Sequence, residues 1–454
     1  MANKSSLRQF LDELDSVGAL RRVTRRVDPE FEIGAILGLR DAGPAQLFET
    51  VGGSGLAVVG NVLNSRARFA LAFGIAPEAL DDHCAEAVAS PVPPAIVDHG
   101  PVQDEVFDGA PDLASLLPVP RWFERETAPY ITAGAIVARD PETGRPNLSI
   151  ARLRLEGGNR VMAGIAANHH LNILARKAKA RGEALEFAVA IGNHPAVLLA
   201  SQMYVDLGRD EFEIAGALQG EPVELVPCRT VALAVPAEAE IVLEGVLRPD
   251  ESIEEGPVSE FPGFYVRYGP GVAGEISCVT RRKDAIFQAI LPGFASEHCL
   301  LGAVAIGATL RHELSRTVPA VRNVAITEGG MGRLHAVISM HRPRLGEGKR
   351  AILLAMGLVN LLKLVIAVED DVDPHDWKRV EWSLGARFRG GEDLIVLPGV
   401  KADRCDPVHE DLTVTKIGMV ATTRPGDGEP GSRSEFARPP GEVLERIRRD
   451  LDLY

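Results

Sequence analysis

Cysteine is scarce in this chain, and its distribution fits neither a disulfide framework nor a thiolate metal site. The 454 residues contain five cysteines, and no two of them have CxxC spacing. An odd number without recurrent spacing argues against paired disulfides, and the missing CxxC argues against structural zinc. We therefore expect all five to be reduced and structural.

Aromatic residues, basic runs and long apolar runs are also scarce. Aromatic side chains make up 5% of the chain, and the net charge is −14 with no dense Lys/Arg run. These features argue against a nucleic-acid surface. The longest apolar runs, such as Leu300–Leu310, are too short to span a bilayer, and the N-terminal pattern is not that of a signal peptide. We expect a cytoplasmic protein without nucleic-acid or membrane partners.

Common phosphate-binding and nucleophile motifs are missing as well. The chain has no GxGxxG, GxxxxGK[ST] or GxSxG sequence, which excludes the usual dinucleotide, P-loop and serine-hydrolase signatures. Gly329–Gly332 is a glycine-rich turn, but it lacks the lysine of a phosphate loop.

The order of the predicted elements indicates a multidomain α/β (α+β) protein. Strands and helices alternate in the first hundred residues, and a proline-rich stretch at Ser90–Pro94 marks a boundary. A strand-rich block follows, interrupted by a helix near 171–182 and ending with a predicted strand at Ala285–Leu291. A small-residue helix at 301–316 leads into a second α/β unit.

A predicted β-hairpin lies near the start of the strand-rich block. Ile131–Arg139 and the segment from Asn147 are extended in pattern, and Asp140–Gly144 supplies turn residues. This places Asn147 and Arg152 on the second strand. Strict alternation would put them on opposite faces, so both reach one ligand only if the strand bulges or twists, or if the ligand wraps its edge.

Two carboxylates stand close together in a loop without lysine. A Gly-Pro turn separates Glu255 from Glu260. Carboxylates held together raise one pKa, which suits a general acid near neutral pH. The same pattern also fits a solvated loop, and the residues alone do not decide between the two.

Other polar clusters can be explained by ordinary structural roles, without catalysis or metal binding. His169–His170 lacks a local metal-binding partner, and Asp210–Glu213 fits the start of a helix. Glu369–Asp373 ends a strand with carboxylates, which suits either a divalent cation site or a solvated strand end with a helix N-cap at Asp373–Pro374.

Taken in order, several of these segments resemble the UbiD family of (de)carboxylases, which use prenylated flavin mononucleotide (prFMN). The matching segments are Asn147–Arg152, His170, Glu211 and the EGPxxE of Glu255–Glu260, and the resemblance covers nearly the whole chain. It implies an N-terminal α/β region, a split β-barrel that binds prFMN, a linking helix, a C-terminal α/β oligomerisation domain, and an arm with a final helix. The expected boundaries are 1–105, 106–298, 299–318, 319–423 and 424–454.

The resemblance also implies a cofactor site with two metals. Asn147, His170 and Glu211 would hold Mn²⁺ (or Mg²⁺) against the cofactor phosphate, with His169 competing with His170 for the metal. A K⁺ ion would share Glu211 with the positions Leu148, Ala200, Ser201 and Met203. The expected cofactor-binding residues are Asn147, Ser149, Ile150, Ala151, Arg152, His170 and Glu211.

The catalytic residues implied by the resemblance are Arg152, Glu255 and Glu260. They would catalyse reversible, non-oxidative decarboxylation of an aromatic or heteroaromatic (α,β-unsaturated) acid through a covalent prFMN adduct. Glu260 would protonate the carbon that loses CO₂, and Arg152 would orient the carboxylate. The implied partners are this acid, a UbiX-type flavin prenyltransferase that supplies the cofactor, and further copies of the chain in a homodimer or homohexamer.

Two residues near the linking helix are candidate substrate contacts, His298 and Arg311. For the segment Ser296–His298, an alternative is a helix start capped by Ser296. Two alternatives for the whole protein are a non-catalytic flavin- or nucleotide-binding protein and a metal-dependent hydrolase centred on Asp370–Asp373.

Overall fold

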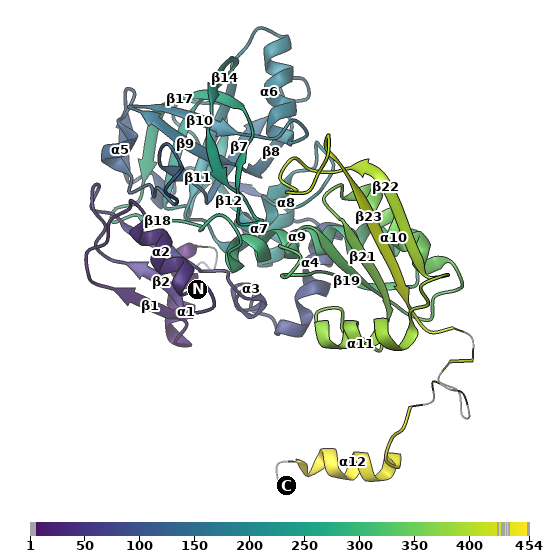
Figure 1. Cartoon of the computed structure of the whole chain (residues 1–454). Helices are drawn as coiled ribbons and strands as arrows, with labels where there is room; N and C mark the ends of the chain where they lie inside the picture. Colours follow the sequence, from purple (N-terminus) through teal and green to yellow (C-terminus); the bar gives the residue numbers. More distant parts are fainter. Residues whose placement is uncertain (1–5, 425, 428–431, 433, 435, 452–454) are drawn as a thin grey trace.

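The computed structural model describes residues 6–424, 426–427, 432, 434 and 436–451. It is a mixed α/β structure of several layers, as predicted (Figure 1). Its N-terminal sheet has the order β1-β2-β3-β18. The strands of this sheet and the helices around it are α1 (Leu7–Ser16), β1 (Leu20–Val23), α2 (Glu32–Leu39), β2 (Ala45–Phe48), β3 (Ala57–Gly60), α3 (Arg66–Phe73), α4 (Leu80–Ala89) and β18 (Ile286–Gln288).

One strand of this sheet comes from far along the chain. The segment Ala285–Leu291 was expected to be a strand of the strand-rich block. The strand it forms, β18 (Ile286–Gln288), instead pairs in parallel with β3 of the N-terminal sheet. That assignment was wrong because local sequence does not specify a strand's partner. As a result, the N-terminal region and the central domain share one sheet.

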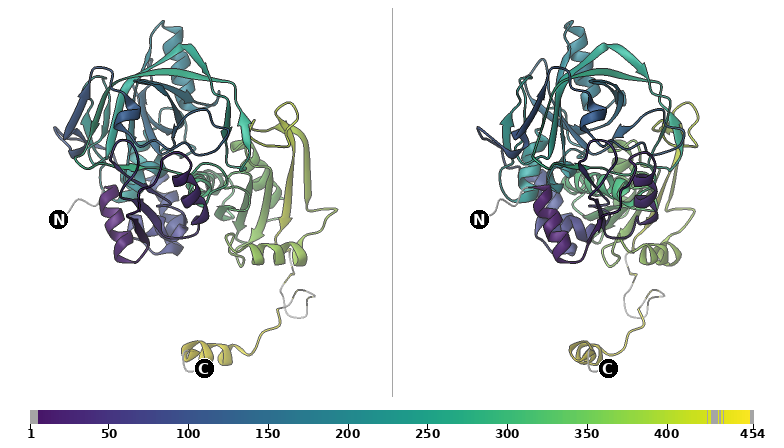
Figure 2. Two further views of the ribbon diagram at one scale, coloured as in Figure 1. Left: turned by 60° about the vertical axis from the view of Figure 1, so that its left-hand side comes forward. Right: turned by 90° about the vertical axis from the view of Figure 1, so that its left-hand side faces the viewer.

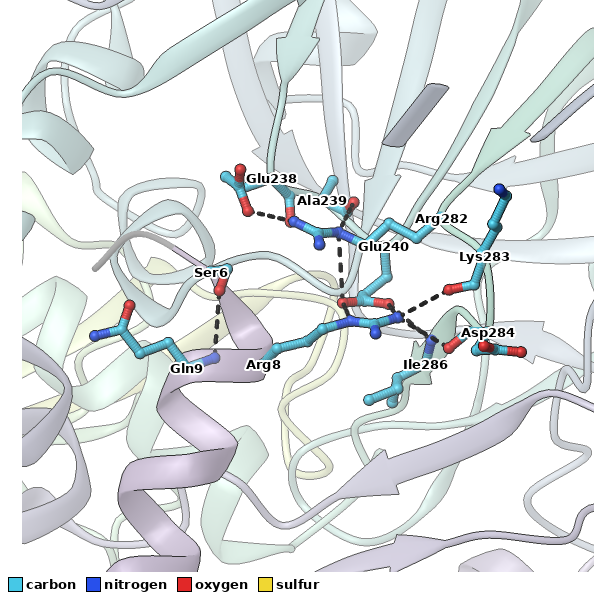
Figure 3. A network of polar contacts seen from close by, with 10 residues as sticks. All are labelled: Ser6, Arg8, Gln9, Glu238, Ala239, Glu240, Arg282, Lys283, Asp284 and Ile286. Atoms are coloured by element: carbon cyan, nitrogen blue, oxygen red, sulfur yellow. Dashed lines mark hydrogen bonds and ion pairs between the residues drawn. The ribbon is translucent and has the colours of Figure 1, made fainter. Parts of the chain in front are cut away.

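Helix α1 is fixed to the central domain by a buried carboxylate (Figure 3). Arg8 donates from Nε and Nη2 to the two oxygens of Glu240, at 2.8 and 2.9 Å. The Glu240 side chain is fully buried and also accepts the backbone N–H of Ile286 at 2.9 Å. Burial in a low-dielectric interior requires this pairing.

The central domain is built on a nine-stranded sheet with the order β6-β9-β10-β17-β14-β11-β7-β8, and β5 pairs with β17. In the described pairing the end strands β6 and β8 do not meet, so the barrel is split. The elements of the sheet and the helices beside it are β5 (Glu105–Asp108), β6 (Tyr130–Ile131), β7 (Gly134–Arg139), β8 (Pro146–Ile150), β9 (Arg152–Gly157), β10 (Arg160–Gly164), α6 (His170–Ala180), β11 (Leu185–Ile191), α7 (Pro195–Ala200), α8 (Glu211–Gln219), β14 (Ile241–Glu254) and β17 (Pro270–Arg281).

The predicted hairpin is present, but its second strand is shorter than expected. β7 and β8 pair with Ala138 opposite Asn147, and Gly144 closes the turn with φ +71°. The strand ends at Ile150, and after Ala151 a new strand, β9, pairs with β6 and β10 instead. Arg152 is therefore not on the hairpin. Because one residue separates two strands at opposite ends of the sheet, strict alternation does not relate Asn147 to Arg152.

A long helix connects the central domain to the C-terminal sheet. α9 (Ser296–Thr317) packs against α4, α7 and β19. The sheet has the order β19-β20-β21-β23-β22, and the last helix, α12, lies apart from the body (Figures 1 and 2). The elements are β19 (Val321–Ile326), β20 (His335–Met340), α10 (Glu347–Leu358), β21 (Leu364–Glu369), α11 (Trp377–Arg387), β22 (Leu394–Lys401), β23 (Thr413–Ala421) and α12 (Gly441–Arg449).

Part of the predicted arm, 424–440, lies outside the described residues. Among the helices that the structure describes, none has the length and apolar character to cross a bilayer.

Candidate active site

Arg152 joins two glutamates at the wall of a cavity. It opens β9, whereas Glu255 lies between β14 and β15 (Pro257–Ser259), and Glu260 follows β15. Arg152 donates to both oxygens of Glu255 at 2.6 and 2.8 Å, and its Nη1 lies 3.2 Å from Glu260 Oε1. The Glu255 side chain is 1% exposed and that of Glu260 is 15% exposed. Glu260 is thus the carboxylate that faces the cavity.

The surroundings keep Arg152 positively charged. Burial lowers its pKa, but the hydrogen bonds and charge of Glu255, with the charge of Glu260, raise the pKa above its ordinary value overall. The guanidinium carbon also lies 4.6 Å from the centre of the Tyr268 ring. A permanent cation between two carboxylates can fix the orientation of both through charge-assisted hydrogen bonds.

A second polar cluster joins the three residues predicted to bind Mn²⁺. Asn147 Nδ2 donates to Glu211 Oε1 at 2.9 Å, and Leu148 N–H donates to Glu211 Oε2 at 2.8 Å. His170 Nδ1 lies 3.5 Å from Asn147 Nδ2 and 3.9 Å from Glu211 Oε1. The structure therefore brings Asn147, His170 and Glu211 together from three separate elements.

Two oxygens in this cluster fit a missing ligand. Asn147 Oδ1 and Ser149 Oγ are buried and have no hydrogen-bond partner in the described part of the chain. Buried acceptors are normally satisfied, so an absent group is expected here. Amide and carboxylate oxygens with an imidazole suit Mn²⁺ or Mg²⁺, which in turn attract a phosphate.

The two neighbouring histidines have different roles. His169 is the N-cap of α6: its Nδ1 accepts the N–H of Leu171, and its Nε2 lies 3.2 Å from the carbonyl of Ile150. Burial lowers the pKa of His169 to about 4. With both ring nitrogens engaged, His169 has none left for a metal, whereas His170 faces Asn147 and Glu211.

The four positions expected to hold K⁺ with Glu211 come from β8 and from the C-terminal end of α7. Leu148, Ser201 and Met203 line the same cavity as Glu211. Ala200 is the last residue of α7, next to Ser201, and its carbonyl accepts the N–H of Met203 at 3.1 Å. Ser201 Oγ donates to the carbonyl of Leu198 at 2.7 Å, which leaves its lone pairs available.

Two adjacent cavities connect these clusters. One of about 250 Å³ is lined by Arg152 and Glu260, and one of about 530 Å³ is lined by His170 and Glu211. Residues that line both include Ile150, Ala166, His169, Gln202, Tyr204, Leu361 and Asp403. Two neighbouring compartments with shared walls suit a cofactor whose phosphate and reactive end lie apart.

The two candidate substrate contacts have different outcomes. His298 lines the smaller cavity, and its Nδ1 lies 3.0 Å from the carbonyl of Gly293. Burial, then the charge of Arg333, lowers the pKa of His298 to about 4, so it is neutral at pH 7. Arg311 was expected at this site, but it pairs with Asp82 on another surface. Because α9 is helical throughout, Arg311 lies several turns from His298.

The alternative for Ser296 as a helix cap is also wrong. The N-cap residue of α9 is Ala295, without a side-chain cap, and Ser296 donates its backbone N–H and hydroxyl to Asp41.

The carboxylates of Asp370–Asp373 do not converge. Asp370 pairs with His341 at 2.6 Å, Asp371 binds Arg387 through two contacts of 2.7 Å, and Asp373 accepts the N–H of His375. No group of three or more His, Cys, Asp or Glu suited to a metal occurs among the residues that the structure describes. This argues against the hydrolase alternative. The cap of α11 is Asp376 rather than Asp373.

Sequence reasoning missed several residues of the smaller cavity. Gly164, Tyr268, Arg333 and Arg404 all line it. The one local signal was the glycine-rich turn Gly329–Gly332, which directly precedes Arg333. The others come from strands and loops whose convergence depends on the tertiary fold.

Comparison with known proteins places these features in context. Three family models match consecutive parts of the chain, described as the N-terminal domain, the Rift-related domain and the C-terminal domain of 3-octaprenyl-4-hydroxybenzoate carboxy-lyase. They match residues 11–88, 95–295 and 299–421.

Three relatives are similar over nearly the whole chain. Anhydromevalonate phosphate decarboxylase from Methanothermobacter thermautotrophicus is 35% identical, over 92% of this chain and 96% of that protein. The UbiD-class enzyme HmfF from Pelotomaculum thermopropionicum, solved with FMN, has a TM-score of 0.91 and 39% identity, with 99% and 100% coverage. Vanillic acid decarboxylase from Sedimentibacter hydroxybenzoicus has a TM-score of 0.89 and 28% identity, with 100% and 99% coverage.

Proposed function

Because the chain belongs to the UbiD family of carboxy-lyases, we propose that it decarboxylates an aromatic or heteroaromatic acid with Glu260 as the proton donor. The observation that carries this proposal is the placement of Arg152 between Glu255 and Glu260 at the wall of the cavity. A protein that only binds a flavin does not need such a pair of carboxylates, one buried and one facing the cavity.

Glu255, Arg152 and Glu260 have different roles in the proposed reaction. Glu255 holds the Arg152 guanidinium through two hydrogen bonds, which fixes the direction of its remaining N–H groups. Arg152 orients the substrate carboxylate and Glu260. Glu260 Oε1 gives a proton to the carbon that has lost CO₂, and its position at the cavity wall suits this transfer.

The cofactor proposed for the larger cavity is prFMN with Mn²⁺. The relatives' structures include one of HmfF in an evolved dimeric form with prFMN. Asn147, His170 and Glu211 would hold the metal against the phosphate, and Leu148, Ser201 and Met203 would contribute to a K⁺ site. When bound, prFMN supplies the electron sink for the pair left behind by CO₂.

The proposal is tested with protein co-expressed with a UbiX-type flavin prenyltransferase. Purified protein should carry flavin absorbance and release CO₂ from an aromatic acid. Glu260→Gln should keep the bound cofactor and lose turnover by roughly a hundredfold or more. An active Glu260→Gln variant would contradict the assigned proton donor. Size-exclusion chromatography with light scattering of the same preparation should give the mass of a homodimer or a homohexamer.

The names of the relatives span two kinds of acid. The name of vanillic acid decarboxylase contains an aromatic acid, and the name of anhydromevalonate phosphate decarboxylase contains a phosphorylated compound. The side chains of the smaller cavity therefore decide the substrate class in this chain.

A further inference from the structure

We propose that the smaller cavity accepts an acid with a second anionic group, a carboxylate or a phosphate ester, and that Arg333 binds this group. The inference rests on the proposed decarboxylation, because it assigns the far end of the same substrate. It names the substrate class as a dianion, meaning here an acid with two separate anionic groups.

Arg333 is a buried cation without a carboxylate partner. It follows the turn Gly329–Gly332, lines the cavity and is 7% exposed. Its Nη1 donates to the carbonyls of Cys299 and Gly332, at 3.2 and 3.0 Å. Within the described part of the chain, no carboxylate lies within ion-pair distance of it. Burying a cation without a counter-charge is costly, so an anion is expected to complete this site.

The position of Arg333 is built into the fold by two glycines. A Cβ on Gly302, in the middle of α9, would overlap the Arg333 guanidinium. Gly332 has φ +66°, and a Cβ there would overlap the carbonyl of Cys299. The Phe261 ring, next to Glu260, lies with its centre 5.8 Å from the guanidinium carbon. These contacts hold Arg333 at the cavity wall, on the side of Phe261 and Glu260.

The other two arginines of this cavity differ from Arg333 in their partners or in their burial. Arg152 has two glutamates, as described above. Arg404 donates Nη1 to the carbonyl of Tyr268 at 3.1 Å and lies 4.0 Å above its ring, where it is less buried than Arg333. Of the three, Arg333 alone is both buried and, among the residues that the structure describes, without a carboxylate at ion-pair distance.

The acidic residues of the cavity have partners of their own. Glu126 accepts the backbone N–H groups of Trp122 and Phe123, at 3.1 and 3.2 Å. Asp403 accepts the N–H of Cys405 at 3.1 Å. In the part of the chain that the structure describes, neither forms an ion pair with Arg333, which leaves its charge available to a ligand oxyanion. A guanidinium fork binds carboxylate and phosphate oxygens with similar geometry.

The test compares matched ligands on flavin-loaded protein by isothermal titration calorimetry, which requires no turnover. The probes are benzene-1,4-dicarboxylate, its monoamide, in which a neutral amide replaces one carboxylate, and 4-phosphonooxybenzoate. We expect the dianions to bind roughly ten- to a hundredfold more tightly than the monoamide. Arg333→Gln should bring the ratio close to one. Arg350→Gln, which removes a charge from an exposed position on α10, should leave it unchanged.

Equal binding of dianions and monoamide by the native protein would overturn the inference, as would a preference unaltered in Arg333→Gln. Comparing the affinities of the two dianions distinguishes the two possible kinds of second anionic group. Tighter binding of one identifies either a dicarboxylate or a phosphate ester as the natural substrate class. If no acid releases CO₂ while the Arg333-dependent preference persists, the decarboxylation is contradicted and the anion site is supported.

Gly302→Ala provides an independent variant. Alanine favours the helix, so α9 should form, but the added methyl displaces the Arg333 guanidinium. We expect this variant to lose dianion preference like Arg333→Gln while retaining bound flavin. A folded Gly302→Ala protein with full dianion preference would count against the assigned position of Arg333.

Discussion

Arg152 reaches Glu255 because Gly164, which lies opposite Arg152 on the adjacent strand β10, has no side chain. A Cβ on Gly164 would lie 2.7 Å from Glu255 Oε1 and 2.8 Å from Arg152 Nε. Gly164→Ala should therefore push the pair apart and lower kcat by about a hundredfold, the cost of a small misplacement in an active site. The measurement is CO₂ release under substrate saturation, with flavin content determined on the same sample.

A matched control is Gly385→Ala. Gly385 lies in α11 with no atom within 4 Å of an added Cβ, so this change should leave kcat unaltered. Alanine there should also stabilise the helix slightly, by roughly 0.5–1 kcal/mol. Unchanged kcat in Gly164→Ala would show that the network tolerates a shift.

At the scale of elements, the ion pair of Arg8 with the buried Glu240 anchors α1 to the central domain. Arg8→Ala leaves the buried Glu240 carboxylate with the N–H of Ile286 and the more distant Arg282, whose Nε lies 3.7 Å away. Removing one partner of a buried ion pair costs roughly 3 kcal/mol or more. We expect a corresponding fall in the free energy of unfolding, measured from urea titration, and early proteolysis of α1.

The exposed pair of Arg22 and Glu49 supplies the comparison. Its atoms lie 3.5 Å apart, and both side chains are more than a third exposed. Glu49→Gln should change the free energy of unfolding by less than about 1 kcal/mol. If both substitutions have equally small effects, the Glu240 contact does not hold α1 in place.

At the scale of the whole molecule, Glu297 makes stability depend on pH. It lies at the start of α9 and accepts the N–H of Leu63, which joins the N-terminal region to the linking helix. Burial raises the pKa of Glu297 to about 7, from an ordinary value of 4.5. The unfolded chain therefore loses this proton at lower pH than the folded chain does.

The sign follows from proton linkage. Between about pH 4.5 and about pH 7 the folded state binds more protons, so this residue's contribution to stability falls as pH rises. Glu297→Gln keeps an acceptor for Leu63 but does not titrate. Its stability relative to the native protein should rise across this range by up to roughly 3 kcal/mol. Parallel pH profiles of the urea midpoint for the two proteins would contradict the role of Glu297.

The sequence by itself determined the elements and the residue chemistry. Hydrophobic periodicity and turn residues are local, so they predicted the hairpin of β7 and β8, α9 and the C-terminal α/β unit. The order of Asn147, His170, Glu211 and the EGPxxE segment gave the family resemblance, which the comparisons confirmed. Local spacing could not pair these residues, because Arg152 and Glu255 are far apart along the chain.

Only the tertiary structure decided which residues meet. The break at Ala151 sends β9 to the other end of the sheet, which frees Arg152 from the alternation of β8. The same packing engages both nitrogens of His169, leaves His170 beside Glu211, and carries Arg311 to a different surface. It also places the Arg333 guanidinium at the cavity, in space that is open only because Gly302 has no side chain. Strand partners and close approaches are set by packing over long sequence separations, which local patterns do not encode.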